Sequence, residues 1–295
     1  MSLHALVEAA TPAIVFFLMA AVGLDLAPAD LRSLRHRWRL LVAGLLAPPL
    51  LLPPLALGLV ALLRPPVEVE AGLLLVAMAP IGGISTTYSY LANAAVALSV
   101  TLTALSCLLA PITLPATAAL VELATGRALG FEVPLGVLAI QVLGLLALPV
   151  GLGMALRGAR PERAARLRPA IQRLALVAVV LLVALVVTSE AEHLLATIGD
   201  TVPLSCLFIG ASFAIGAAVG RATTPDAGER FTLAAEFATR NLGVAVAVAV
   251  TLLGRAEFAL FAATYFLIEL VILLAAIGIQ GRRQRRTALS SRVPR

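Results

Sequence analysis

The chain has 295 residues, of which 61% are hydrophobic and 13% are charged, and its mean hydropathy is +1.02. These values lie far beyond those of an ordinary soluble domain and indicate an integral membrane protein. A bilayer core of about 30 Å takes about 20 apolar residues per helix, so spanning helices and short loops leave no room for a soluble domain. All 22 basic residues are Arg, and the net charge of +6 lies in loops and the tail. Such an excess reports membrane topology, so we expect the lipid bilayer as a partner and no nucleic acid.

The two cysteines, Cys107 and Cys206, both fall within apolar segments. Neither belongs to a CxxC pair or has a His nearby. We therefore expect two buried free thiols rather than a disulfide or a metal site.

Nine apolar segments are long enough to span a bilayer as helices. A spanning strand needs only about 10 residues, and backbone groups in lipid must be satisfied within their own segment, which favours helices. The predicted fold class is an all-α membrane protein with nine transmembrane helices. Their expected ranges are 4–26, 38–63, 70–93, 95–121, 131–156, 169–190, 199–221, 231–253 and 256–280.

Arginines gather in alternate connections between these segments. They follow the first, fifth, seventh and ninth segments, whereas the other connections hold only Arg64, Arg127 and Arg255. The positive-inside rule then predicts a multi-pass protein of the plasma membrane or inner membrane, with its N-terminus outside and its C-terminus cytoplasmic. Residues 282–295 form a basic cytoplasmic tail, which we interpret as a stop signal that also favours anionic lipid.

Two segments contain residues that interrupt a smooth helix. The third holds Pro80, Gly82 and Gly83, and the eighth holds the run Thr-Arg-Asn-Leu-Gly at 239–243. Breaks of this kind are tolerated only where they are buried in protein or line a cavity. The third and eighth segments are corresponding members of two four-helix units, and interrupted spans at equivalent positions mark the midplane site of a transporter. We therefore predict an inverted repeat, in which the fifth helix has no counterpart.

The eighth segment also carries Glu236 and Arg240, which lie four residues apart and so on one face of a helix. A charged side chain at bilayer depth costs at least ~2.5–3.5 kcal/mol on insertion scales, so two of them indicate a function. We interpret them as the working site. The alternative is that the two side chains only neutralise each other and hold two helices together.

Four stretches resemble the bile acid:sodium symporter family, which includes bacterial transporters of small organic anions. They are residues 23–30, 47–53, 80–103 and 236–243, and the third is the most specific, with Gly-Gly, Tyr-Leu-Ala and Ala-Leu-Ser-Val in order. The resemblance implies a nine-helix member with the fold of the sodium/proton antiporters, in which two broken helices cross at the midplane of a core domain beside a panel domain. The panel would comprise residues 4–26 and 131–190, and the core residues 38–121 and 199–280.

The resemblance places the family's first sodium site on five oxygen-bearing side chains, although Asn is more usual at the second position. Oxygen ligands are what a hard cation takes in place of water. The alternative is that the hydroxyls only bond to neighbouring helices. We expect no metal other than this sodium ion and no other cofactor. The five predicted ligands are Ser85, Thr86, Ser99, Thr103 and Glu236.

The family's second sodium site has no match, because Pro48 and Arg240 stand where family members place Gln. Proline has no side-chain oxygen, and Arg is a permanent cation with donors only. Two like charges 4 Å apart repel by about 4 kcal/mol at an effective dielectric of 20. Our hypothesis is that Arg240 replaces the second ion, and that transport couples to one sodium ion or to a proton through Glu236.

The predicted substrate-binding or charge-substituting residues are Gly83, Arg240, Asn241 and Glu269. Asn241 matches a family Asn that reaches substrate, and a free helix N-terminus beside it would suit a carboxylate. Glu269 lies well inside the last apolar segment, where it either pairs with Arg240 or carries a proton.

These residues predict a secondary active transporter of a small organic anion, working by alternating access. A passive channel or facilitator for the same solutes is the alternative. An enzyme is not expected, since neither the paired Asp or Ser/His residues of a protease nor the Arg/His cluster of a phosphatase occurs. Bile acids, pantoate-like acids and keto acids all fit a cavity beside Arg240, so the substrate stays open, as does the oligomeric state.

Overall fold

The computed structural model describes residues 3–26, 37–126, 135–189 and 191–290, and every regular element in these ranges is a helix. Together with the apolar composition, this confirms an all-helical membrane protein. Five helical stretches are long and apolar enough to cross a membrane, namely Trp38–Leu63, Val96–Thr125, Ala139–Ala159, Glu192–Thr223 and Ala256–Arg282.

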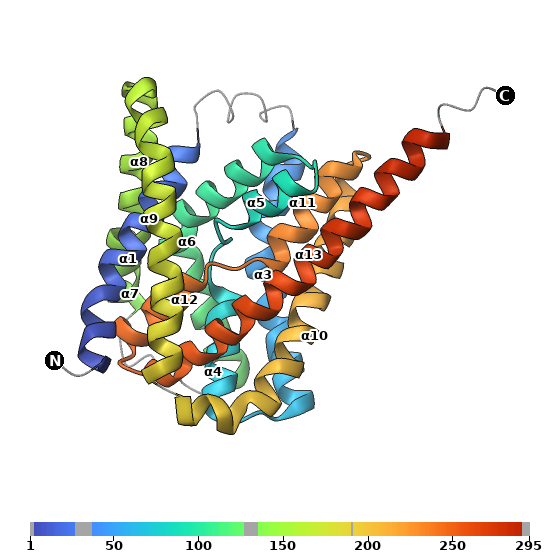
Figure 1. Ribbon diagram of the computed structural model, residues 1–295. Helices are drawn as coiled ribbons and strands as arrows, with labels where there is room; N and C mark the ends of the chain where they lie inside the picture. Colours follow the sequence, from blue (N-terminus) through green and yellow to red (C-terminus); the bar gives the residue numbers. More distant parts are fainter. Residues whose placement is uncertain (1–2, 27–36, 127–134, 190, 291–295) are drawn as a thin grey trace.

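The helices follow the predicted segments in order along the chain (Figure 1). Their bounds are α1 Leu3–Asp25, α3 Trp38–Leu63, α4 Val67–Met78, α5 Ser85–Leu91, α6 Val96–Thr125, α7 Leu135–Val142, the π-helical turn η2 Leu143–Ala147, α8 Leu148–Ala159, α9 Pro161–Ser189, α10 Ala191–Thr223, α11 Ala227–Ala238, α12 Leu242–Ala247, the π-helical turn η3 Val248–Leu252, the 3₁₀ turn η4 Ala256–Phe258 and α13 Ala259–Ser290.

Three predicted helix ends are wrong because the helices continue beyond the apolar runs. Helix α9 begins at Pro161, α10 begins at Ala191, and α13 continues to Ser290. Arg, Glu, Ala and Leu are strong helix formers, so a helix persists after hydropathy has fallen. Most of the predicted tail is therefore helical. Its last residues, 291–295, and the predicted start of the fifth segment lie outside the described residues.

Both predicted interruptions are present, and they lie against each other. One separates α4 from α5 and the other separates α11 from α12. Ile81 and Arg240 form an antiparallel bridge. On its two sides, the Gly82 amide donates to the Thr239 carbonyl over 3.1 Å, and the Asn241 amide donates to the Pro80 carbonyl over 2.8 Å. Because a bilayer offers no water to unpaired backbone groups, each break supplies the partners of the other.

Side chains from neighbouring helices satisfy further backbone groups at this crossing. The Ile81 amide donates to Ser106 Oγ on α6 over 3.1 Å. Tyr265 Oη on α13 donates to the carbonyl of Ala238, the last residue of α11, over 2.5 Å. The crossing is thus held from both sides by helices that are themselves continuous.

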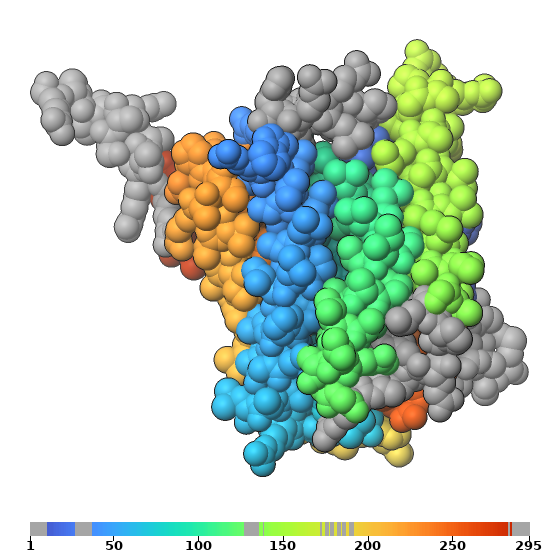
Figure 2. Space-filling model, turned by 180° about the vertical axis from the view of Figure 1, so that it is seen from behind, coloured from blue at the N-terminus to red at the C-terminus, as the bar shows by residue number. Residues whose placement is uncertain are grey.

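The remaining helices surround the crossing. Helix α1 packs against α8 and α9, and α10 packs against α11, α13 and α3. Gly23 and Gly153 bring the α1 and α8 backbones into direct contact, since a Cβ on Gly23 would lie 2.1 Å from the Val150 carbonyl oxygen. Figure 1 shows α1, α8 and α9 on one side of the interrupted helices and α10 on the other. The reverse face is covered by α3 and α6, side by side (Figure 2).

The cysteine prediction holds for one residue only. Both thiols are free, and Cys107 is buried, but Cys206 is exposed on α10. Its neighbour Leu207 is also exposed. A residue in an apolar spanning helix can face either protein or lipid, and hydropathy does not distinguish the two.

We expect Gly82→Ala to destabilise the protein, because the new methyl group would lie 2.5 Å from the Arg240 carbonyl oxygen and push the two breaks apart. Overpacking of this kind costs about 1–3 kcal/mol. The measurement is the melting temperature of the purified protein in detergent. Gly58→Ala is the control, since nothing lies within 4 Å of a Cβ there. Equal melting temperatures for the two variants would contradict a tightly packed crossing.

Candidate functional site

The five predicted ion ligands lie together beside the crossing, brought there by three helices. Ser85 and Thr86 stand in the first turn of α5, directly after one break. Ser99 and Thr103 lie one turn apart on α6. Glu236 lies near the end of α11, just before the other break.

Their oxygen atoms form one connected cluster. Ser99 Oγ donates a short hydrogen bond to Glu236 Oε1, and Thr103 Oγ1 donates to Glu236 Oε2 over 3.3 Å. Ser85 Oγ lies 3.4 Å from Ser99 Oγ and 3.2 Å from Thr103 Oγ1. Thr86 Oγ1 completes the cluster at 3.2 Å from Ser99 Oγ. We call these five residues the oxygen cluster.

The oxygen cluster is suited to a hard monovalent cation. Glu236, Ser85 and Ser99 have no exposed surface, and hydroxyl and carboxylate oxygens are the donors that such cations prefer. Within the described part of the chain, no group of three or more His, Cys, Asp or Glu residues could hold a metal ion. The chemistry of the donors therefore fits sodium better than a transition metal.

Arg240 is buried at the crossing, with 3% of its surface exposed. Its Nη2 donates to the carbonyl of Ala79, directly after the last residue of α4. The C-terminal end of a helix carries a partial negative charge, so this position favours a cation. Between residues that the structure describes, no ion pair within 4.0 Å joins Arg240 to Glu236 or Glu269. Neither acid is therefore in direct contact with Arg240, whose guanidinium is held by the carboxyl end of α4.

A cavity of 460 Å³ lies beside the crossing. All four residues predicted to bind substrate or substitute for an ion line it, namely Gly83, Arg240, Asn241 and Glu269. Thr86 lines the cavity as well, so the oxygen cluster and the cavity share a wall.

Arg240 also borders a second, much smaller void of 20 Å³. Pro48, Ala79 and Ser106 are among its other lining residues. Pro48 and Arg240 therefore lie beside the same void. They are the two residues that stand where the resemblance puts the Gln residues of a second ion site.

The helix N-terminus expected beside Asn241 is that of α12, which begins at Leu242. The Asn241 side chain caps α12 itself, since its Oδ1 accepts from the Val244 amide over 3.2 Å. Its Nδ2 contacts Met19 Sδ at 3.5 Å and Cys107 Sγ at 3.8 Å. Asn is a preferred N-cap residue, and this local hydrogen bond uses the amide oxygen of a side chain whose residue also lines the cavity.

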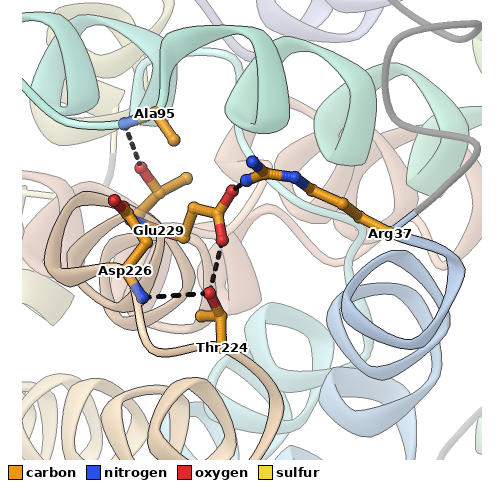
Figure 3. Close-up of polar contacts among 6 residues, drawn as sticks. Arg37, Ala95, Thr224, Asp226 and Glu229 are labelled. Atoms are coloured by element: carbon orange, nitrogen blue, oxygen red, sulfur yellow. Dashed lines mark hydrogen bonds and ion pairs between the residues drawn. The ribbon is translucent and has the colours of Figure 1, made fainter.

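A polar network that was not predicted from the sequence fixes the start of α11 (Figure 3). Glu229 is 4% exposed, accepts from Thr224 Oγ1 over 2.5 Å and forms an ion pair with Arg37. Asp226 caps the helix by accepting from the Glu229 amide over 2.8 Å. The signal was present, because an acidic N-cap followed three residues later by Glu marks a helix start. The network positions the helix that carries Glu236.

Comparison with known proteins gives two matches. The model of the Sodium Bile acid symporter family matches residues 12–197, which is more than half of the chain. The chain is also similar to the "Uncharacterized sodium-dependent transporter YocS" of Bacillus subtilis (strain 168). The two are 28% identical over 233 residues, which cover 79% of this chain and 71% of that relative.

Sodium binding can be measured as an increase in the melting temperature of the purified protein. We expect Thr103→Val to raise about tenfold the sodium concentration that gives half of this increase. The substitution keeps the shape of the side chain and removes one oxygen atom from the cluster. Loss of a ligand contact worth about 1.4 kcal/mol lowers the affinity for the ion tenfold. Thr101→Val is the matched control on the same helix, because the Thr101 hydroxyl bonds only to the Ala97 carbonyl of its own helix, over 2.8 Å. Sodium titrations that shift equally in both variants would contradict an ion site here.

Proposed function

Because the chain belongs to the sodium bile acid symporter family, we propose that it is a sodium-dependent secondary transporter of small organic anions that works by alternating access. The observation that supports this most is the shared wall between the oxygen cluster and the cavity at Thr86. A cation in the cluster would lie beside a solute in the cavity. Their binding would then be coupled, as symport requires.

The sodium ion would be held by the oxygen cluster. Glu236 supplies the negative charge, and the hydroxyls of Ser85, Ser99 and Thr103 supply neutral oxygens around it. A site for a proton would need the carboxylate alone. Four hydroxyl groups gathered around one acid favour sodium over a proton as the coupled ion.

Arg240 would take the place of a second sodium ion as a charge fixed to the chain. Its guanidinium binds the carboxyl end of α4, and the small void that it shares with Pro48 has room for about one water molecule. A sodium ion in that void would face a permanent positive charge with no acidic side chain among the residues that line it. We therefore infer coupling to one sodium ion.

The helix packing supports a division into two moving parts. Helix α1 lies against α8 and α9, in agreement with a panel of residues 4–26 and 131–190, and the crossing lies within residues 38–121 and 199–280, which would form the core. We propose nine spanning helices in an inverted repeat, with a cytoplasmic C-terminus. Rocking of the core against the panel would expose the cavity to each side in turn.

A passive channel for the same solutes is the less favoured alternative. A channel has no use for a fully buried carboxylate surrounded by hydroxyl groups, because it couples no ion to its solute. Membrane burial of Glu236 carries a cost that ion coupling explains and passive conduction does not.

Transport measurements test this proposal. Small carboxylates are first screened for thermal stabilisation of the protein with and without sodium, and the best one is then used for uptake into proteoliposomes. We expect an inward sodium gradient to drive uptake and an inward proton gradient to fail. Uptake that ignores both gradients would favour the channel. A stoichiometry of two sodium ions per substrate would contradict the role of Arg240.

We expect Arg240→Gln to reduce sodium-driven uptake tenfold or more, whereas Arg255→Gln should leave it within twofold. The first change removes a buried charge that no neighbouring side chain can replace. Arg255 is half-exposed, forms an ion pair with Glu257 and lies over the Phe258 ring, so its loss is screened by water. The measurement is the initial uptake rate at matched protein levels. Equal effects would assign Arg240 a structural role.

A further inference from the structure

A second set of buried hydrogen bonds lies one helical turn from the oxygen cluster. Thr232 Oγ1 on α11 accepts a hydrogen bond from the Ser89 hydroxyl over 3.3 Å. It also accepts one from the Ala95 amide over 3.1 Å (Figure 3). Ser89 lies near the end of α5, and Ala95 is the residue that precedes α6. We call these three residues the Thr232 layer.

The Thr232 layer repeats the arrangement of the oxygen cluster on the same three helices. Each of its members lies four residues from one of the predicted ion ligands, and four residues make about one helical turn. The Ser99 amide donates to the Ala95 carbonyl over 3.1 Å, so one of these pairs is joined directly. The pairs are Ser89 with Ser85, Ala95 with Ser99, and Thr232 with Glu236.

The start of α6 takes its hydrogen-bond acceptor from another helix. Ala95 is the N-cap of α6, and no side chain of its own helix caps this end. In a capping box, a Glu or Gln three residues into the helix accepts from the N-cap amide. Leu98 stands at that position and has no acceptor. Thr232 therefore takes this role, and the place where α6 begins depends on α11.

The contacts of Thr232 also fix the distance between the helices that carry the oxygen cluster. One hydroxyl oxygen joins the end of α5 and the start of α6 to α11. Ser89 and Thr232 have no exposed surface, so water does not replace a lost partner there. The affinity of an ion site depends on how firmly the surrounding contacts hold its ligands in place.

We propose that Thr232 is a positioning residue of the sodium site. It holds α5, α6 and α11 at the separation at which their oxygen atoms fit the ion, and it does not contact the ion itself. This inference rests on the proposed function and extends it from the ion ligands to the contact that places them. It assigns part of the affinity for sodium to a residue one turn away from the site.

Equilibrium binding of radioactive sodium to the purified protein at a fixed temperature tests this inference. We expect Thr232→Val to raise the dissociation constant for sodium about fivefold, because a buried hydrogen bond is worth a factor of roughly 2 to 12. Thr232→Ser keeps the oxygen atom and should restore most of the affinity. A purely structural role would lower the melting temperature and leave the dissociation constant unchanged.

Thr117→Val is the matched control. Thr117 is also a buried threonine, but its hydroxyl donates to the Thr113 and Leu114 carbonyls of its own helix, over 2.8 and 3.0 Å. We expect this variant to bind sodium like the unchanged protein. Ser89→Ala removes only one of the two bonds to Thr232 and should weaken binding by a smaller factor. It decides the question if Thr232→Val does not fold.

The outcomes separate this inference from the proposed function. Sodium binding by the unchanged protein, with equal dissociation constants for Thr232→Val and Thr117→Val, would overturn the role of Thr232 and leave the ion site intact. Weak binding that Thr232→Ser does not restore would also overturn it, since the lost oxygen atom would not be the cause. Unchanged binding by Ser89→Ala would count against the Thr232 layer. No sodium binding by the unchanged protein would overturn both proposals.

Discussion

Two breaks in the backbone lie within spanning segments, and the need to satisfy their hydrogen bonds shapes the rest of the structure. A helix that stops inside a bilayer leaves amides and carbonyls that lipid cannot pair. Here the breaks satisfy each other through the Ile81–Arg240 bridge, with help from Ser106 and Tyr265. This mutual dependence fixes where α4, α5, α11 and α12 end. It therefore also fixes the position of every polar side chain that the helix ends carry.

The polar residues of the site follow from this crossing. Ser85 begins the helix after one break, and Glu236 lies one turn before the other, so the bridge brings a hydroxyl and a carboxylate together although they are far apart in sequence. Continuous helix α6 adds Ser99 and Thr103 at the spacing of one turn. Arg240 occupies the bridge itself, where its Nη2 donates a hydrogen bond to the Ala79 carbonyl at the carboxyl end of α4. The oxygen cluster and one fixed cation thus result from the same backbone geometry.

The features that depend on residue type can be predicted from the sequence. The direction in which a side chain points cannot. Pro80 and Gly82 mark a break because no spanning helix tolerates them easily, and the hydroxyl and acidic residues mark a cation site by their chemistry. The pairing of the two breaks is a long-range contact that local pattern does not contain. The cap that Asn241 forms on α12 was not expected from the sequence. Cys206 faces outward, because helical periodicity does not show which face meets protein.

Arg240 has a consequence for the energy available to such a carrier. A guanidinium is covalently part of the protein, so it is never released on either side of the membrane. One sodium ion moving with one monovalent anion carries no net charge, and the electrical potential then contributes nothing, although it is worth about 2.3 kcal/mol per elementary charge per 100 mV. Accumulation would depend on the chemical gradient of sodium alone. Uptake by such a carrier would persist in a depolarised cell, but its concentration ratio would be lower than the ratio that an electrogenic carrier can reach.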